Sequence, residues 1–228
     1  LSVGVRAWSP FIPGDVESSM LPCAFFEVFL RNTSSVQQQG KLVFCFPGAI
    51  PETFVGELTY QGDESYTPNA RWPLFPPPPE KITRKLVQHA ELQAVLVEDG
   101  RYSYCMGVLE QDRNVGFAGM PGRDGSAWRK LPGNLPAAGQ SEPGTAMVVD
   151  FTIPPGDVVH IPLLLSWYAQ RWQGAGDNRY TNMYAVRYAD AFAVAKIAAS
   201  KHASCLARVL SWQNVIYREK NLPGWMRD

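Results

Sequence analysis

A change in the character of the chain near residue 181 most constrains its fold. Before that point, short apolar or alternating segments are separated by clusters of Pro, Gly, Asn and Asp, the pattern of antiparallel strands joined by turns. Residues 183–217 contain no Gly or Pro and many alanines, a composition typical of helix. The sequence therefore predicts a mainly β fold that ends in a helical segment.

The apolar segments before residue 181 predict an antiparallel sandwich. Residues 92–110 should form a hairpin, because Asp99-Gly100 supplies the positive φ angles of a tight turn. Residues 158–167 are nearly all apolar, so this strand should be central and covered on both faces. The other expected strands are residues 3–8, 22–31, 41–46, 54–60 and 146–153.

Three longer segments carry more open expectations. Residues 68–79 are too rich in Pro to join a sheet and should form a stiff connector, with a ligand for an SH3-like partner as the alternative. Residues 116–144 should form either a packed excursion or a loop that covers a site. Residues 183–217 should form two helices with a break near His202, or one long helix, with another element starting at Trp225-Met226.

Composition and motifs exclude several classes of function. The chain has 21 basic and 21 acidic residues and no basic run, which argues against binding to nucleic acid or to an anionic membrane surface. It shows no bilayer-spanning apolar run and no signal region. It also lacks a glycine-rich phosphate loop, a GxSxG motif and an HExxH motif. Only 18% of the residues are charged, which indicates that some surface is covered by a partner.

Cysteine and histidine spacing points away from a metal centre. No CxxC pair and no His pair at ligand spacing is present, so we expect no zinc site. Free thiols in a reducing compartment are the favoured interpretation, with disulfides or a metal site as alternatives. The residues concerned are Cys23, Cys45, Cys105, Cys205, His89, His160 and His202.

Carboxylates and aromatic residues are the remaining candidates for a site. Asp15 with Glu17, and Asp63 with Glu64, are neighbours that could form an acid and nucleophile pair, although solvated turn charges are the simpler interpretation. Several aromatic residues lie in or beside predicted loops, where they would form either a platform for sugar rings or ordinary core. They are Trp8, Phe11, Trp72, Phe75, Trp128, Trp167, Tyr168 and Trp172.

The segment WSPFIPGDVESSMLP, residues 8–22, predicts a rigid corner. Its three prolines restrict the backbone before docking, so little entropy is lost when it packs. Trp8, Phe11 and Ile12 can supply apolar contacts, while Asp15 and the two serines, Ser18 and Ser19, can cap exposed amides. We therefore expect its carboxylates to hold the corner in shape, against another domain, rather than to catalyse a reaction.

This corner, followed by an apolar strand and Arg31-Asn32-Thr33, resembles the N-terminal domain of the non-lysosomal glucosylceramidase and bile-acid β-glucosidase family, glycoside hydrolase family 116. The similarity continues in family order along nearly the whole chain. It includes Trp128 to Leu131, MVVDFTIPPGD, Ser166-Trp167, Tyr180-Thr181 and LPGW. Residues 37–39, 76–79 and 115–123 depart from the family pattern.

The resemblance implies an antiparallel β-supersandwich and a helical linker that leads toward an absent (α/α)6 barrel. On that basis residues 1–180 form a β-sandwich domain with its first strands missing, residues 181–221 the linker, and residues 222–228 the start of the barrel. The family's Glu nucleophile and Asp acid/base belong to the barrel. We therefore assign no catalytic residue, no metal and no cofactor here, and leave substrate-binding residues open.

As a function, the resemblance implies the non-catalytic N-terminal region of a retaining β-glucosidase or glucosylceramidase. Its partners would be the barrel of the same polypeptide and a β-glucoside or glucosylceramide substrate. The expected location is cytoplasmic, with peripheral membrane association of the full enzyme left open. A free-standing carbohydrate-binding or scaffolding module, or a pure interaction module, is the alternative.

Overall fold

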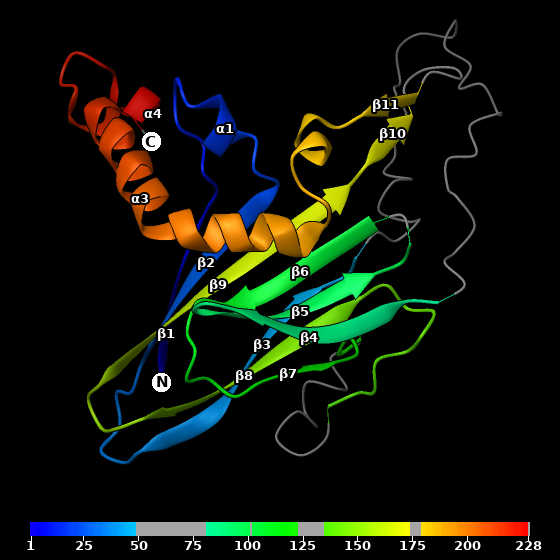
Figure 1. Cartoon of the computed structure of the whole chain (residues 1–228). Coiled ribbons are helices and arrows are strands. Elements are labelled where there is room, and N and C mark those ends of the chain that lie inside the picture. The colour runs from blue at the N-terminus through cyan, green and yellow to red at the C-terminus, as the bar shows by residue number, and fades with distance from the viewer. Residues whose placement is uncertain (49–80, 101, 123–134, 174–178, 228) are drawn as a thin grey trace, which may run out of the picture.

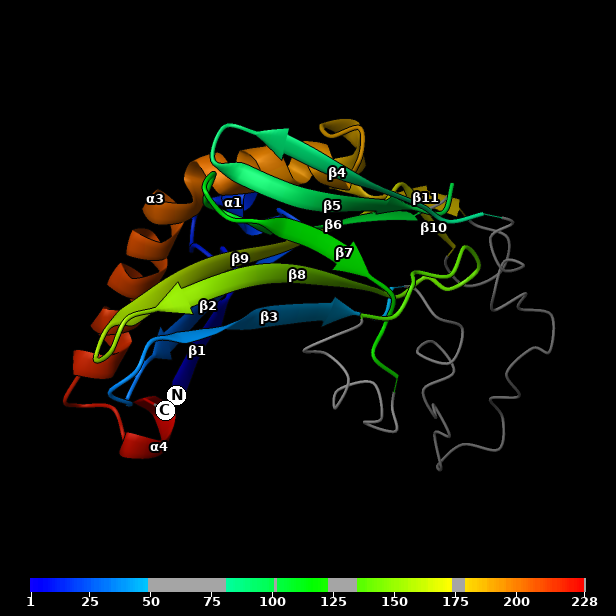
Figure 2. The same ribbon diagram turned by 90° about the horizontal axis from the view of Figure 1, so that it is seen from below.

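The computed structural model describes residues 1–48, 81–100, 102–122, 135–173 and 179–227. Two antiparallel sheets pack face to face, and a long helix covers the outer face of the larger sheet (Figures 1 and 2). The predicted mainly β fold with a helical C-terminal segment is confirmed. The predicted boundaries of the three parts of the chain stay a prediction.

The larger sheet has the strand order β1-β2-β9-β6-β5-β4, and the smaller has the order β3-β8-β7. Two short strands, β10 and β11, form a separate hairpin that runs into the helical region. The strands are β1 (Ser2–Trp8), β2 (Cys23–Arg31), β3 (Gln38–Phe46), β4 (Thr83–His89), β5 (Leu92–Glu98), β6 (Tyr102–Val108), β7 (Val115–Ala118), β8 (Thr145–Ile153), β9 (Val158–Ala169), β10 (Arg171–Gln173) and β11 (Arg179–Thr181). The helices are α1 (Val16–Ser19), the 3-10 turn η2 (Met183–Val186), α3 (Ala191–Arg218) and α4 (Gly224–Arg227).

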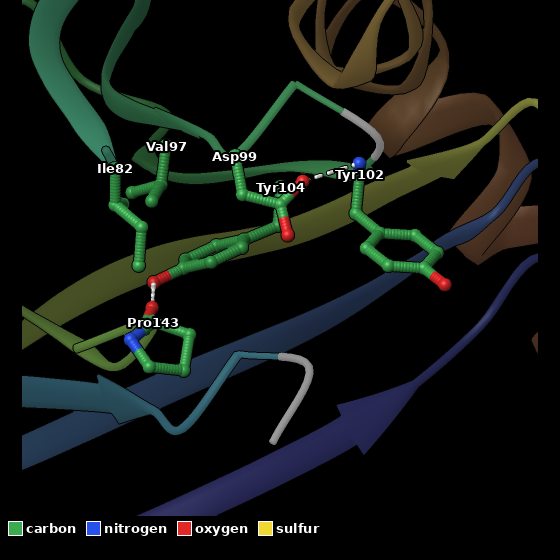
Figure 3. Close-up of a pocket in the computed structure, with 6 residues that line it drawn as sticks. All are labelled: Ile82, Val97, Asp99, Tyr102, Tyr104 and Pro143. Carbon is green, nitrogen blue, oxygen red and sulfur yellow. Dashed lines mark hydrogen bonds between the residues drawn. The ribbon is translucent and has the colours of Figure 1, made fainter. Parts of the chain in front are cut away.

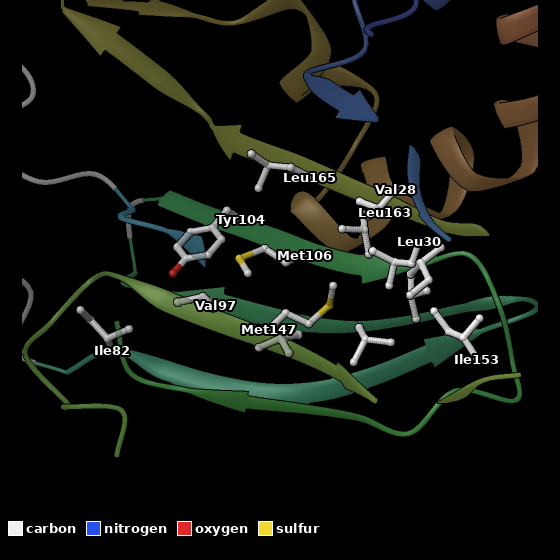
Figure 4. Close-up of a cluster of buried hydrophobic side chains, with 14 residues drawn as sticks. Val28, Leu30, Ile82, Val97, Tyr104, Met106, Met147, Ile153, Leu163 and Leu165 are labelled. Carbon is white, nitrogen blue, oxygen red and sulfur yellow. The ribbon is translucent and has the colours of Figure 1, made fainter. Parts of the chain in front are cut away.

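The period-two pattern of each strand divides its side chains between two cores. On β2, Val28 and Leu30 point into the space between the two sheets, where they meet residues of β8 such as Met147 (Figure 4). Cys23 and Phe25 point to the other face and pack under α3. The larger sheet is therefore buried on both faces over much of its area. This burial agrees with the sequences of its central strands, which contain few polar residues.

Strand β9 has the central position that its apolar sequence predicts. It pairs with β2 on one side and β6 on the other, and residues Ile161 to Leu165 are buried. The hairpin of β5 and β6 is also confirmed, with Gly100 at φ 84° in the turn. The strand expected at 54–60 and the connector expected at 68–79 lie outside the described residues.

Several elements differ from expectation. β4 was not predicted. It lies at the exposed edge of the larger sheet, where Lys, Arg and Gln are tolerated and interrupt the alternation of apolar and polar residues. β7 lies in the segment expected to be a loop, and its four residues add an edge to the smaller sheet. The short hairpin of β10 and β11 was also not predicted, because three-residue strands carry little periodicity.

The helical region starts later than its composition predicts. Residues 183–190 form a 3-10 turn and a loop, and α3 begins only after Asp190, whose Oδ1 accepts from the Ala193 amide at 2.7 Å. From there α3 is one continuous helix of 28 residues, so the single-helix alternative is confirmed. It changes direction part-way along its length, and its second half leaves the sheet (Figure 1). The element expected at Trp225-Met226 is α4.

Small residues allow the first half of α3 to lie close to the sheet. Ala191, Ala195 and Ala198 are fully or almost fully buried against the outer face. Two serines of the sheet also bond to the first turn: Ser103 Oγ accepts from the Ala191 amide at 3.0 Å, and Ser166 Oγ donates to the Ala191 carbonyl at 2.8 Å. The start of the helix is thus fixed by both packing and hydrogen bonds.

Candidate functional site

The predicted corner connects β1 to β2 and is braced by its own side chains. Asp15 caps the short helix α1, because its two carboxylate oxygens accept from the amide and the hydroxyl of Ser18, each at 2.9 Å. Ser19 Oγ accepts from the Ile12 amide at 2.9 Å and donates to the Ile12 carbonyl at 3.0 Å. Gly14, at φ 80°, supplies the left-handed turn that lets these groups meet.

The corner docks on the second half of α3. Ile12 is 5% exposed and packs with Cys205 and Val209 of the helix. Trp212 Nε1 donates to the Phe11 carbonyl at 2.8 Å, and the two rings meet edge to face at 5.8 Å. The expected apolar contacts of the corner are therefore confirmed, and the surface they meet within this chain is a helix that lies almost 200 residues further along.

Charge pairs surround this apolar contact. Asp15 binds Arg208 of α3, while Glu17 lies 3.3 Å from Lys201 and 3.6 Å from Arg187. The Ser18 amide, followed by Arg208, lowers the pKa of Asp15 to about 2. The interpretation of Asp15 and Glu17 as merely solvated turn charges is thus incomplete, since both bridge the corner to helical residues.

A second polar cluster lies deeper, where β1 and β2 meet the middle of α3. Glu27 of β2 is 1% exposed and binds Arg6 of β1, whose Nε donates to Glu27 Oε2 at 2.6 Å. His202 of α3 lies 3.1 Å from the other carboxylate oxygen. Nothing local in the sequence marks these three residues as neighbours, apart from a charged residue in the middle of the apolar run CAFFEVFLR.

A small hollow lies between β5, β6 and the segments that precede β4 and β8 (Figure 3). It is lined mainly by apolar groups, and Tyr104 closes it by donating its hydroxyl proton to the Pro143 carbonyl. Burial raises the pKa of Tyr104 to about 12, so the phenol stays protonated. The volume of about 20 Å³ suits a water molecule and is too small for a sugar ring.

The structure separates the aromatic residues expected as a sugar platform. Trp8 stacks on Phe25 with ring centroids 4.4 Å apart and belongs to the core, and Tyr168 meets Tyr184 at 5.9 Å. Phe11 packs on Trp212, while Trp167 stays 41% exposed at the end of β9. The side chains of Trp72, Phe75, Trp128 and Trp172, and the pair Asp63 and Glu64, lie outside the described residues.

The cysteines, the candidate metal ligands and the helices can also be assessed in the structure. Cys23, Cys105 and Cys205 are buried free thiols and Cys45 is a half-buried one; burial raises the pKa of Cys23 to about 12. Within the described residues, no group of three His, Cys, Asp or Glu side chains is arranged to hold a metal ion. Over the same part of the chain, no helix is both long and apolar enough to cross a membrane.

Comparison with protein families decides what kind of domain this is. Residues 1–205 match the model described as beta-glucosidase 2, glycosyl-hydrolase family 116 N-term. The chain belongs to this family. The match covers the corner, both sheets and the first half of α3, so the resemblance seen in the sequence is confirmed. The comparison with curated proteins found no match.

The motifs that this chain shares with the family 116 N-terminal domains have identifiable positions in the structure. The segment that carries the resemblance, WSPFIPGDVESSMLP, is the segment that the structure uses to join β1, β2 and α3. Asn32 of the adjacent turn is fully buried, and its Nδ2 donates to the Val36, Ile153 and Pro154 carbonyls at 2.7 to 3.0 Å. These family motifs have structural roles in this fold.

Proposed function

We propose that this chain is the non-catalytic N-terminal region of a retaining β-glucosidase or glucosylceramidase. In this proposal it supports an (α/α)6 barrel that follows it in the same polypeptide and carries the catalytic Glu and Asp. The observation that carries the proposal is the family match over residues 1–205 with the description of a beta-glucosidase N-terminal part.

The contacts of three described carboxylates support a non-catalytic role for this region. Asp15 caps α1 and binds Arg208, Glu27 is enclosed by Arg6 and His202, and Asp150 binds Lys41 at 2.6 Å. A glycosidase needs one carboxyl group that donates a proton and another that attacks or activates water, with a sugar between them. The three carboxylates are instead engaged in contacts that hold the fold.

The end of α3 offers the surface on which such a barrel would pack. The second half of the helix extends beyond the sheet, toward α4 and the C-terminus (Figure 1). Val215 is 72% exposed and Trp225 is 77% exposed, and other apolar residues of this region are exposed as well. They include Leu210, Ile216, Tyr217 and Met226. Exposed apolar side chains gathered in one region are typical of a surface that another domain covers.

Substrate and location belong to the proposal too. A β-glucoside is the substrate class that the name of the family model supports. Glucosylceramide, as the particular substrate, is supported by the resemblance seen in the sequence. A cytoplasmic location is supported by the four free cysteines, because disulfides form mainly in oxidising compartments. Peripheral attachment of the full enzyme to membranes is part of the proposal only through the resemblance.

Hydrolysis of an aryl β-glucoside tests the proposal directly. The polypeptide encoded by the whole gene should release the aglycone, and the 228-residue chain alone should not. Hydrolysis by the 228-residue chain would contradict the assignment of the catalytic groups to a following barrel. Calorimetry of the chain with glucose and cellobiose tests the carbohydrate-binding alternative, which predicts heat of binding that Trp167→Ala removes.

A surface variant tests the barrel contact separately. Val215→Asp should leave the unfolding of the 228-residue chain unchanged, because this side chain is 72% exposed there. In the full-length enzyme the same change should lower the melting temperature, because the charge would be buried in the contact. Val36→Asp is the matched control, because Val36 lies in the turn between β2 and β3 and its side chain is 60% exposed. Equal effects of the two variants would contradict the proposed contact.

A further inference from the structure

Strand β1 forms an open edge of the larger sheet. It pairs with β2 in one unbroken register from Ser2 to Trp8, and in the described part of the chain it has no strand on its other side. The backbone N–H and C=O groups on that side can therefore bond to another strand. Every residue of β1 except Trp8 is exposed.

The face of β1 that is turned toward the smaller sheet carries apolar side chains. Val3 and Val5 lie opposite two residues of β2 that are buried in the core between the sheets. Val3 is nevertheless 59% exposed and Val5 is 62% exposed. The smaller sheet ends over β2, where the Phe44 ring of its edge strand β3 lies 5.1 Å from the Phe26 ring. β1 therefore projects beyond the smaller sheet, and its two valines stay uncovered among the described residues.

The two edges of the larger sheet differ in how they are protected. β4, at the opposite edge, carries Arg, Lys, Gln and His, and charged side chains on an edge strand discourage pairing with another chain. β1 contains no Lys, no Pro and no bulge. Its one charged residue, Arg6, is bound to Glu27 on the face that is turned away from the smaller sheet. An exposed apolar edge of this kind favours pairing with a further strand.

The sequence of β1 is complementary to itself in an antiparallel arrangement. When Gly4 is placed opposite Gly4 of a second copy, Val3 lies opposite Val5 of that copy. Ser2 then lies opposite Arg6 of the second copy, so apolar residues meet on one face and no like charges meet on the other. A two-fold axis at Arg6 would instead place two guanidinium groups opposite each other, which is unfavourable. Charge and apolar pattern thus favour a register centred near Gly4.

We propose that β1 is a docking edge for a second copy of this chain, and that two copies associate by antiparallel pairing of their β1 strands. The pairing would join the two six-stranded sheets into one continuous sheet, with the same surface used by both copies. One pair of short strands buries less surface than an obligate interface does, so the dimer should be weak and dependent on concentration. The proposal concerns the sheet edge and does not depend on the proposed catalytic function.

Sedimentation equilibrium of the 228-residue chain tests the association. The apparent mass should rise from 25.3 kDa toward twice that value as the concentration approaches about 1 mM. Val5→Lys should raise the dissociation constant by about tenfold or more, because it places a charge in an apolar cross-strand pair twice in each dimer. Leu86→Lys is the matched control, since Leu86 is 56% exposed on the same face of the opposite edge strand, and it should leave the constant unchanged.

Hydrogen exchange of the unmodified chain locates the contact without any variant. Amide exchange within β1 should slow as the concentration rises, because N–H groups at its free edge become bonded in the dimer. Exchange within β4 and in the second half of α3 should not change. The polypeptide encoded by the whole gene should show the same protection of β1 together with self-association.

Three results would overturn the proposal. The first is a chain that stays monomeric up to about 1 mM. The second is a dimer that Val5→Lys and Leu86→Lys weaken equally, or whose protected amides lie at the end of α3. The third is a whole-gene polypeptide in which β1 is protected at every concentration without self-association, because another segment of the same polypeptide would then occupy the edge.

Discussion

Replacing Ile12 by Ala is the sharpest test of how the corner is held on α3. Ile12 is 5% exposed and packs with Cys205, which is 3% exposed, and Val209, which is 4% exposed. These residues form a small cluster of their own, separate from the two main cores. The substitution should therefore weaken the docking of the corner without disturbing the sandwich.

The expected cost can be worked from the carbons removed. Ile→Ala deletes three carbons, and at about 0.8 kcal/mol for each buried CH₂ the transfer contribution is about 2.4 kcal/mol. Buried Ile→Ala changes cost about 2–5 kcal/mol once the cavity is included. We expect the lower half of that range, because exposed Phe11 and Val16 allow the corner to relax into the space. For a chain of this length, 2–3 kcal/mol corresponds to a fall in melting temperature of roughly 4–12 °C.

Urea unfolding and thermal unfolding, followed by circular dichroism, would measure this change. Ile12→Val removes one carbon and should cost about 0.5–1.5 kcal/mol. Val16→Ala is the matched control, because Val16 lies in the same corner but is 67% exposed, so its cost should stay within about 0.5 kcal/mol. Hydrogen exchange should show faster exchange in the second half of α3 for Ile12→Ala only.

The reasoning would be refuted if Ile12→Ala unfolded within about 0.5 kcal/mol of the unmodified chain, as an exposed residue does. Equal costs for Ile12→Ala and Val16→Ala would refute it as well. In either case the contact among Ile12, Cys205 and Val209 would contribute nothing measurable to stability, and the corner would not be held by apolar packing on α3.

Three further changes test other parts of the structure. Asn32→Ala leaves three carbonyl acceptors without their buried donor and should lower the free energy of unfolding by at least about 2 kcal/mol in urea titrations, whereas Ser35→Ala, in the same turn, should have little effect. Tyr104→Phe removes the bond to the Pro143 carbonyl and should cost about 1 kcal/mol; no loss in thermal unfolding would contradict its role at the hollow. Asp15 has a lowered pKa, so its contribution is complete above pH 3.8 and is lost as the pH falls toward about 2. In Asp15→Asn the melting temperature should accordingly fall less steeply over that window than in the unmodified chain, and parallel curves would contradict the pairing.

Much of the sheet could be predicted because strand signals are local. The alternation in residues 3–8, the apolar run of 158–167 and the turn at Asp99-Gly100 each lie within a few residues, and the structure has a strand or turn at each. Expectation failed where the local signal was weak. β4 carries Thr, Arg, Lys and Gln on an exposed edge, and β7 has only four residues in a region rich in Gly. Position at the edge of a sheet, rather than residue pattern, made these segments strands.

For the corner, too, the local structure could be predicted from the sequence, whereas the long-range contacts could not. Its prolines, Asp15 and the two serines indicate a braced turn, and the structure confirms both the cap and the bracing. Its docking partner was not predictable in this detail. Arg208 and Trp212 are nearly 200 residues away, and neither stands out on a helix that is rich in alanine.

The sequence by itself determined the class of the fold, the corner, the helical composition of the C-terminal segment and, through its motifs, the family. These properties depend on residues close together in the chain, where backbone preferences and periodicity act. Only the tertiary structure decided that Glu27, an acid in the middle of an apolar strand, would be buried between Arg6 and His202. A buried charge is tolerable only when its partners are brought to it. That requirement is met here by residues 21 and 175 positions away, which the packing of β1 and α3 on β2 alone brings together.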